Sequence, residues 1–271
     1  MREGTDVGCS VPKPAAESYV WDRREGLLAG PVEDAPMRAA DSWLVTSGRV
    51  RALDRHRARF GTAFAEHVGP EEFGEFWHAV VAALPRQGDW FPRVELVTAG
   101  PEPSLRLRVR PAPPLGTRIR VWPLDGPDER RAPRTKGPDL PWLGRARARA
   151  VDAGADEALL TTAAGTVVEG ATSALLWWED DVLCLPSPSL PVLDSVTAGL
   201  VVDRAADLGV PIEYRECDLS GLAGREAWFV NALHGIRPVV SWVGTAVEPG
   251  PPSRAGEWSE WLSALAEPLA L

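Results

Sequence analysis

One mid-chain lysine is the residue of this sequence with the clearest potential for chemistry. Of the 29 basic residues only two are lysines, Lys13 and Lys136. A lysine can lose its proton and attack a carbonyl carbon as a free amine, whereas an arginine stays charged. Lys136, in a Thr-Lys-Gly-Pro-Asp segment, is therefore a candidate for amine chemistry. A GC-rich codon bias explains the many arginines, and chance survival of one lysine is the simpler alternative.

Two segments downstream carry groups that could assist this lysine. Glu169 follows an apolar pair of valines and precedes a glycine. Ser195 and Thr197 open a predicted helix at 197–208, where free backbone N–H groups could bind an anion. The structural alternatives are an ordinary charge at a strand end for Glu169 and a helix N-cap for Ser195 or Thr197.

Hydrophobic periodicity predicts the elements of the first half. Apolar residues at helical spacing indicate helices over 53–67 and 71–84. Strands are predicted at 94–97, 105–109 and 119–122, the second from alternation of Leu and Val with Arg. Residues 1–38 are weakly patterned, with one short strand predicted at 19–21.

The second half alternates short strands with three helices. Helices are predicted at 145–152, 197–208 and 257–265, and strands at 158–161, 166–168, 173–178, 182–185, 212–215, 227–230 and 239–243. The pattern favours an α+β fold of two domains. We expect an N-terminal α/β domain at 1–124, a polar, proline-bearing linker at 125–134 and a larger strand-rich domain at 135–271.

Composition limits the classes of function. The chain has 271 residues, 45% hydrophobic content and a net charge of −9 without a basic block, which argues against a nucleic-acid surface. No apolar run reaches the ~20 residues of a membrane helix. Three cysteines without metal spacing indicate free thiols in a reducing compartment. We expect a cytoplasmic protein with no membrane or nucleic-acid partner and no metal.

The motifs occur in an order that resembles one family. They are an H-x-x-R helix, the Lys136 segment, Gly-Ala-Asp-Glu-Ala-Leu-Leu, Val-Glu-Gly, Val-Thr and Asn-Ala-Leu-His-Gly-Ile-Arg-Pro-Val, at residues 56–59, 135–139, 154–160, 168–170, 196–197 and 231–239. This ordered set resembles the class IV aminotransferases, which include aminodeoxychorismate lyases. The resemblance implies fold type IV, with a small α/β domain and a larger pseudo-barrel domain.

The resemblance also implies pyridoxal phosphate as cofactor and assigns roles to individual residues. Lys136 would bind the cofactor covalently and move protons, and Glu169 would keep the pyridine nitrogen protonated. The phosphate would lie against Arg59 and the loop and helix start at 195–197 (Ser195, Val196 and Thr197). Asn231 would lie near the cofactor's hydroxyl face, Ala232 stands at the position of a phosphate-binding residue in the last loop, and His56 would have a packing role.

Substrate contacts are expected from three residues. Arg110 stands where the family often places an arginine that meets a substrate carboxylate, and a solvated stripe with Arg106 and Arg108 is the alternative. Trp43 and His234 are further candidates, for which packing is the alternative. The resemblance implies a small-molecule substrate and a homodimer whose sites borrow loops from the partner.

Departures from the family bear on the reaction. Ala232 replaces a phosphate-binding Thr of the aminotransferases, and the Asn-Ala-Leu loop is closer to that of the lyases. The aromatic residue that follows the lysine in branched-chain enzymes is absent, and so is the Thr or Glu of the segment at 39–45. We expect an aminodeoxychorismate lyase that yields 4-aminobenzoate and pyruvate. Alternatives are a D- or branched-chain aminotransferase, a specialised-pathway relative, and a non-catalytic member.

Overall fold

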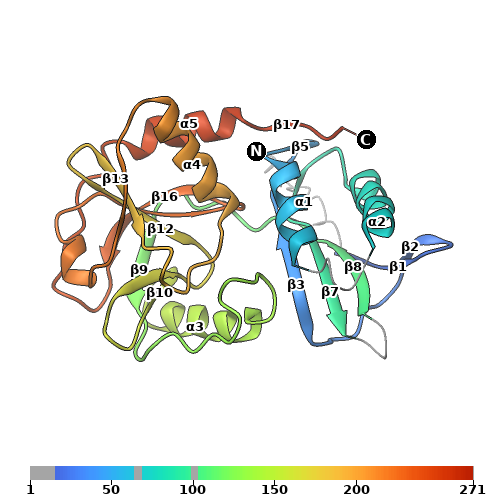
Figure 1. Cartoon of the computed structure of the whole chain (residues 1–271), viewed down its shortest axis with the longest axis horizontal. Helices are drawn as coiled ribbons and strands as arrows, with labels where there is room; N and C mark the ends of the chain where they lie inside the picture. The colour runs from blue at the N-terminus through green and yellow to red at the C-terminus, as the bar shows by residue number, and fades with distance from the viewer. Residues whose placement is uncertain (1–15, 64–68, 99–102, 271) are drawn as a thin grey trace, which may run out of the picture.

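The chain folds into two lobes that lie side by side (Figure 1). The structure is a computed structural model that describes residues 16–63, 69–98 and 103–270. Lys13, Cys9 and the end of the helix predicted at 53–67 lie outside these residues. Within them, no helix has the length and apolar character needed to cross a bilayer.

The N-terminal lobe is built on an antiparallel sheet of five strands in the order β2-β1-β8-β7-β3. These strands are β1 (Glu17–Asp22), β2 (Gly26–Ala29), β3 (Met37–Ser42), β7 (Arg93–Thr98) and β8 (Pro103–Val109). Helices α1 (Leu53–Thr62) and α2 (Pro70–Ala83) pack their apolar sides against it. The weakly patterned start of the chain therefore supplies three strands, of which only β1 was predicted.

A small second sheet links this lobe to the end of the chain. It joins β17 (Glu267–Pro268), β5 (Arg49–Val50), β4 (Val45–Thr46) and β6 (Asp89–Trp90) in that order. Figure 1 shows the C-terminal segment running from α5 back across to the N-terminal lobe. The last residues therefore belong to both lobes rather than to the second domain alone.

The C-terminal lobe contains one mixed sheet of eight strands in the order β11-β10-β9-β16-β15-β12-β13-β14. Their bounds are β9 (Ile119–Pro123), β10 (Glu157–Thr161), β11 (Val167–Gly170), β12 (Ala174–Glu179), β13 (Val182–Pro186), β14 (Ile212–Arg215), β15 (Ala227–Asn231) and β16 (Gly235–Trp242). The edge strand β11 contacts β12 and β13, so the sheet curls on itself. Its inner face forms one apolar core.

Helices cover the outer face of this curled sheet. Helices α4 (Val196–Asp207) and α5 (Ala255–Ala264) share a core with β12 and β15, and α3 (Leu140–Asp152) packs on β9 and β10. A short 3-10 helix, η1, spans Leu219–Leu222. The expected α+β architecture of two domains is confirmed by these elements.

The boundary between the lobes differs from the expected one. Strand β9 pairs in parallel with β10 and β16, so it belongs to the C-terminal lobe. The chain crosses at 110–118, and the segment 125–134 is not a linker. The backbone N–H of Asp128 donates to the Thr161 carbonyl, so this segment is bound within the second lobe. Parallel pairing joins strands distant in sequence, which a local pattern does not reveal.

Candidate functional site

A cavity of about 400 Å³ is lined by residues of both lobes. Almost all the predicted site residues line it: Arg59, Arg110, Lys136, Glu169, Ser195, Val196, Thr197, Asn231, Ala232 and His234. Segments as far apart as α1 and the turn after β15 thus meet in one place. The remaining candidate, Trp43, does not line this cavity.

Trp43 is a core residue of the N-terminal lobe. Its side chain is 1% exposed and packs on Trp77 and His56, with ring centroids 5.3 Å and 5.7 Å away. The prediction that Trp43 binds substrate is therefore wrong, and the packing alternative holds. The residue before it, Ser42, lines the cavity instead.

The main chain around Lys136 is hydrogen-bonded to strand β3 of the other lobe and packs closely against it. The Ala40 N–H donates to the Lys136 carbonyl at 2.7 Å. Gly137 has φ +134°, and a Cβ there would lie 2.7 Å from the carbonyl carbon of Ala39. Only glycine fits such a close approach of two backbones at this angle. The Lys-Gly pair thus places the lysine at the junction of the lobes.

The Lys136 amine has the properties of a nucleophile. Its Nζ makes no hydrogen bond with the described residues, and the side chain lines the cavity. Burial, reinforced by the Arg59 guanidinium, lowers the pKa of Lys136 to about 8, against the opposing carboxylates of Asp41 and Glu169. A larger share of the amine is therefore neutral near pH 7 than for an ordinary lysine.

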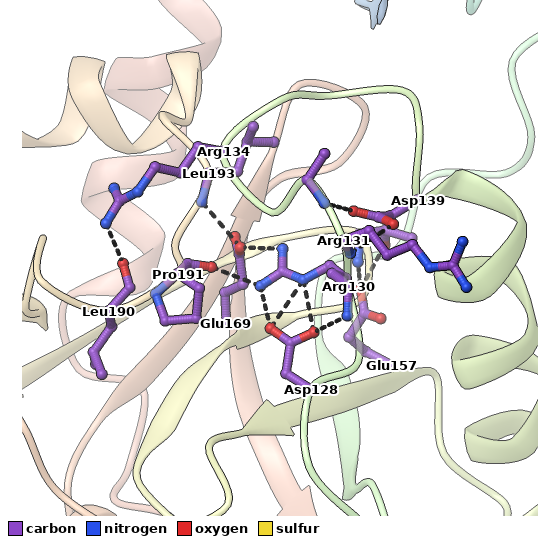
Figure 2. Close-up of polar contacts among 12 residues, drawn as sticks. Asp128, Arg130, Arg131, Arg134, Asp139, Glu157, Glu169, Leu190, Pro191 and Leu193 are labelled. Atoms are coloured by element: carbon purple, nitrogen blue, oxygen red, sulfur yellow. Dashed lines mark hydrogen bonds and ion pairs between the residues drawn. The ribbon is translucent and has the colours of Figure 1, made fainter. Parts of the chain in front are cut away.

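Glu169 is held by one of its two oxygens. Its Oε1 accepts from Arg130 Nη1 at 2.6 Å and from the Leu193 N–H at 3.0 Å. Figure 2 shows Arg130 between Glu169 and Asp128, with a further bond to the Pro191 carbonyl. No described residue donates to Oε2. Burial raises the pKa of Glu169 to about 7, although Arg130 lowers it.

Arg130 is a site residue that the sequence analysis missed. It lines the cavity from the segment expected to be a linker. Its side chain is 4% exposed and pairs with both Asp128 and Glu169. The polar, proline-bearing composition of 125–134 predicted a linker, and only the fold shows that this arginine points inward. The neighbouring Asp139 fixes the segment by accepting from the N–H groups of residues 131 and 132.

Asp41 fixes the direction of Arg59. Both carboxylate oxygens of Asp41 accept from Arg59, through Nε and Nη2 at 2.8 Å each, and Oδ1 also bonds His56 Nδ1 at 2.9 Å. Burial alone would raise the pKa of Asp41, but the hydrogen bond from His56 and the Arg59 guanidinium hold it well below its usual range. His56 thus supports the site through Asp41, in addition to packing.

The start of helix α4 lies beside Arg59. Arg59 Nη1 donates to the Asp194 carbonyl at 2.8 Å. Ser195 is the N-cap, and its hydroxyl accepts from the Ala198 N–H. The N–H groups of Val196 and Thr197 have no acceptor among the described residues. A guanidinium and two free amides at a helix N-terminus form a site suited to phosphate.

Asn231 and Ala232 shape the turn between β15 and β16. Asn231 Oδ1 accepts from the N–H groups of Leu233 and His234, and its Nδ2 donates to the Thr172 carbonyl. The Asn231 amide is therefore occupied within the protein. Ala232 lines the cavity, and its carbonyl accepts from Arg51. The turn is a cavity wall whose shape depends on Asn231.

Arg110 and its neighbours are enclosed rather than solvated. Arg93 and Arg108 both donate to the buried carboxylate of Glu95. Arg110 has no such carboxylate: its Nε donates to the Phe91 carbonyl, and its guanidinium stacks on the Phe91 ring. Burial and the nearby Arg93 lower the pKa of Arg110 to about 10, so it remains charged. Arg110 is thus a cavity cation able to bind an anion.

Several polar groups of these residues have no hydrogen-bond partner in the described part of the chain, and together they fit pyridoxal phosphate. The free Lys136 amine suits the aldehyde, and Oε2 of Glu169 is left for the pyridine N–H. Arg59 and the α4 amides suit the phosphate. Among the described residues, no cluster of three or more His, Cys, Asp or Glu side chains could hold a metal ion.

Comparisons with known proteins agree with this geometry. Residues 38–242 match the family model described as amino-transferase class IV. A curated aminodeoxychorismate lyase of Bacillus subtilis is 30% identical over 83 residues, which are 30% of this chain and 28% of that enzyme. The chain thus matches less than a third of that relative's length.

Solved structures share the fold at low sequence identity. A branched-chain aminotransferase of Thermoproteus uzoniensis superposes with a TM-score of 0.79 at 19% identity, covering 94% of this chain and 99% of that one. A fold IV-transaminase of Curtobacterium pusillum gives 0.72 at 18%, covering 92% and 97%. At this identity the likeness concerns the fold.

Proposed function

Because the chain belongs to the class IV aminotransferase family, whose cofactor is pyridoxal phosphate, we propose that it is a lyase that converts 4-amino-4-deoxychorismate into 4-aminobenzoate and pyruvate. The chain is a pyridoxal-phosphate-dependent enzyme, and the identity of its reaction is the proposal. We also propose that the enzyme is a cytoplasmic homodimer and that its substrate is a small molecule.

One observation favours the lyase over a transaminase. The turn at 231–234 is built around Asn231, and the next residue, Ala232, offers no hydroxyl to the cavity. An Asn-Ala-Leu turn resembles that of the lyases. The partial match to the Bacillus subtilis aminodeoxychorismate lyase supports the same choice.

The cavity residues divide the work of this reaction. When bound, the cofactor accepts the electron pair released at the substrate carbon that bears nitrogen. Lys136 Nζ in its neutral form takes the proton from that carbon, which as a positioned base contributes roughly 10²–10⁴-fold to the rate. Glu169, whose Oε2 accepts no hydrogen bond from the described residues, would stabilise the positive charge at the pyridine nitrogen. Arg59 and the α4 amides bind the phosphate.

Two measurements test the proposal. Borohydride reduction of the loaded protein followed by peptide mapping should place the pyridoxyl label on Lys136, and a label on Lys13 would overturn the assignment. A substrate panel then identifies the reaction. Appearance of 4-aminobenzoate and pyruvate from aminodeoxychorismate supports the lyase, whereas glutamate formed from an amino donor and 2-oxoglutarate would identify an aminotransferase.

A further inference from the structure

Arg237 is a buried cation without a partner. It lies on β16 with its side chain on the inner side of the curled sheet, opposite Phe229, and it lines the cavity. The residue is 5% exposed, and its Nε is buried without a hydrogen-bond partner. The guanidinium makes no hydrogen bond or ion pair with the described residues. A buried charge in this state is costly unless an anion joins it.

Two further donors stand beside Arg237. The Gly116 N–H donates to His234 Nδ1 at 3.1 Å, so that nitrogen is an acceptor and the ring proton is on Nε2. Burial and the neighbouring Arg237 and Arg147 lower the pKa of His234 to about 4, so the ring is neutral. Arg147 reaches the same cavity from α3.

The nearby carboxylates of Glu157 and Asp156 attract the Arg237 charge, but neither forms a hydrogen bond or ion pair with it among the described residues. Glu157, on the same inner face, accepts from Thr172, Ser173 and the Ala158 N–H, and it lies beyond ion-pair distance of Arg237. Asp156 is held by two nitrogens of Arg120. The charge of Arg237 is therefore available to a ligand in the cavity.

The cavity thus has a cationic end in each lobe. Lys136, Glu169, Arg59 and the α4 amides account for the cofactor. Arg110 remains on the N-terminal lobe and Arg237 on the C-terminal lobe. The crossing segment at 110–118 runs from one to the other, and its Pro113 and Pro114 line the cavity between them. A substrate with one carboxylate would leave one end unpaired.

We propose that Arg237, together with His234 Nε2 and Arg147, binds a second carboxylate of the substrate, so that this enzyme prefers dicarboxylates. This inference rests on the proposed function in one respect, that the cavity binds substrate next to pyridoxal phosphate. It extends the proposal because it assigns the C-terminal end of the cavity a role in selecting the substrate. Arg237 and Arg110 would then hold opposite ends of one molecule.

The test measures binding of adipate and hexanoate to the protein loaded with pyridoxal phosphate. The two probes have the same chain length and differ by one carboxylate. Isothermal titration calorimetry should show that the parent binds adipate more tightly. Arg237→Gln should weaken adipate binding by about 10- to 100-fold and leave hexanoate binding unchanged, because a hydrogen bond to a charged group is lost.

A matched control is available in Arg106. It is also a buried arginine with an unpartnered Nε, but it lies on β8 and does not line the cavity. Arg106→Gln should keep the parent's preference for adipate. Equal weakening in both variants, or no preference in the parent, would overturn the inference.

A second variant keeps the test decisive if Arg237→Gln fails to fold. Arg147 is exposed on α3, so Arg147→Gln should fold and weaken adipate binding by a smaller factor. An unchanged preference for adipate in that variant would then refute the subsite. The lyase and the subsite fail separately. Absence of 4-aminobenzoate with a retained adipate preference contradicts only the reaction, and turnover without that preference contradicts only the subsite.

Discussion

Arg130 holds Glu169 by a single oxygen, through Nη1 and Oε1 at 2.6 Å, and no described residue donates a hydrogen bond to Oε2. The same guanidinium pairs with Asp128 and bonds the Pro191 carbonyl. Arg130 therefore fixes the direction of the carboxylate and opposes the effect of burial on its charge.

Arg130→Leu should reduce turnover at pH 7 and move the rate profile to higher pH. Burial raises the pKa of Glu169 to about 7 even with Arg130 present, so removal of the cation raises it further. The carboxyl would then be protonated in the neutral range and become charged only as pH rises. We expect a loss of at least about tenfold in kcat, equivalent to ~1.4 kcal/mol in the barrier.

The control for this change is the next residue. Arg131 is exposed, and only its backbone is fixed, by Asp139. Figure 2 shows its side chain directed away from Glu169. Arg131→Leu should keep the parent's kcat and pH profile. A profile of Arg130→Leu that matches the parent's would contradict the role given to this pair.

Glu169→Gln should retain the cofactor and lose most activity. A neutral amide can still fill the space and bond Arg130 through its oxygen, but it cannot stabilise a protonated pyridine nitrogen. Removal of one preorganised charge of this kind costs on the order of 10²-fold or more in kcat. Cofactor content by absorbance and turnover on one preparation separate the two effects. Unchanged turnover would remove Glu169 from the mechanism.

The sequence predicted the residues that carry the chemistry of the site better than the residues that hold them in place. Lys136, Glu169 and Arg59 meet in one cavity as the ordered motifs implied. Arg130 and Asp41 were missed because their roles come from burial and pairing, which a polar stretch does not show. The helices and most strands of the second half agree with the hydrophobic pattern. Strand β9 was placed in the wrong lobe because its partners are remote along the chain.

Attachment of pyridoxal to Lys136 should show a pH midpoint near 8. The neutral amine is the attacking form, so the rate rises with pH and levels off above the pKa of about 8. An ordinary lysine would show its midpoint only near pH 10.4. Stopped-flow absorbance with pyridoxal, which lacks the phosphate, measures this step. Because Arg59 lowers the pKa of Lys136, Arg59→Ala should move the midpoint upward, and a midpoint near 10 in the parent would contradict the prediction.

Gly137→Ala should destabilise the protein and displace the lysine. The new Cβ would lie 2.7 Å from backbone atoms of β3, at a φ of +134°. We expect a loss of about 1–3 kcal/mol in the free energy of unfolding, together with weaker cofactor attachment. Gly144→Ala is the control: it lies within α3 with nothing within 4 Å of the added carbon. That variant should gain about 0.5–1 kcal/mol, so denaturation midpoints shifted in opposite directions would confirm the contact.

Arg59→Ala should weaken binding of pyridoxal phosphate far more than Thr197→Ala. Arg59 is oriented by the two hydrogen bonds that it donates to Asp41, and it lies beside the start of α4. The loss of a charge-assisted contact with phosphate costs about 1.5–3 kcal/mol, or roughly 10- to 150-fold in Kd. Thr197→Ala removes only a hydroxyl and keeps the amides of residues 196 and 197, so a change of about threefold is expected, under 1 kcal/mol.

Equilibrium dialysis of both variants with pyridoxal phosphate and with pyridoxal tests the assignment of the phosphate site. The difference between Arg59→Ala and the parent should disappear with pyridoxal, because that ligand has no phosphate. Both variants should regain part of their turnover at excess cofactor, since Lys136 and Glu169 are intact. Equally tight binding of pyridoxal phosphate by Arg59→Ala and the parent would show that the phosphate lies elsewhere. The pairing of Asp41 with Arg59 would then serve only to join β3 to α1.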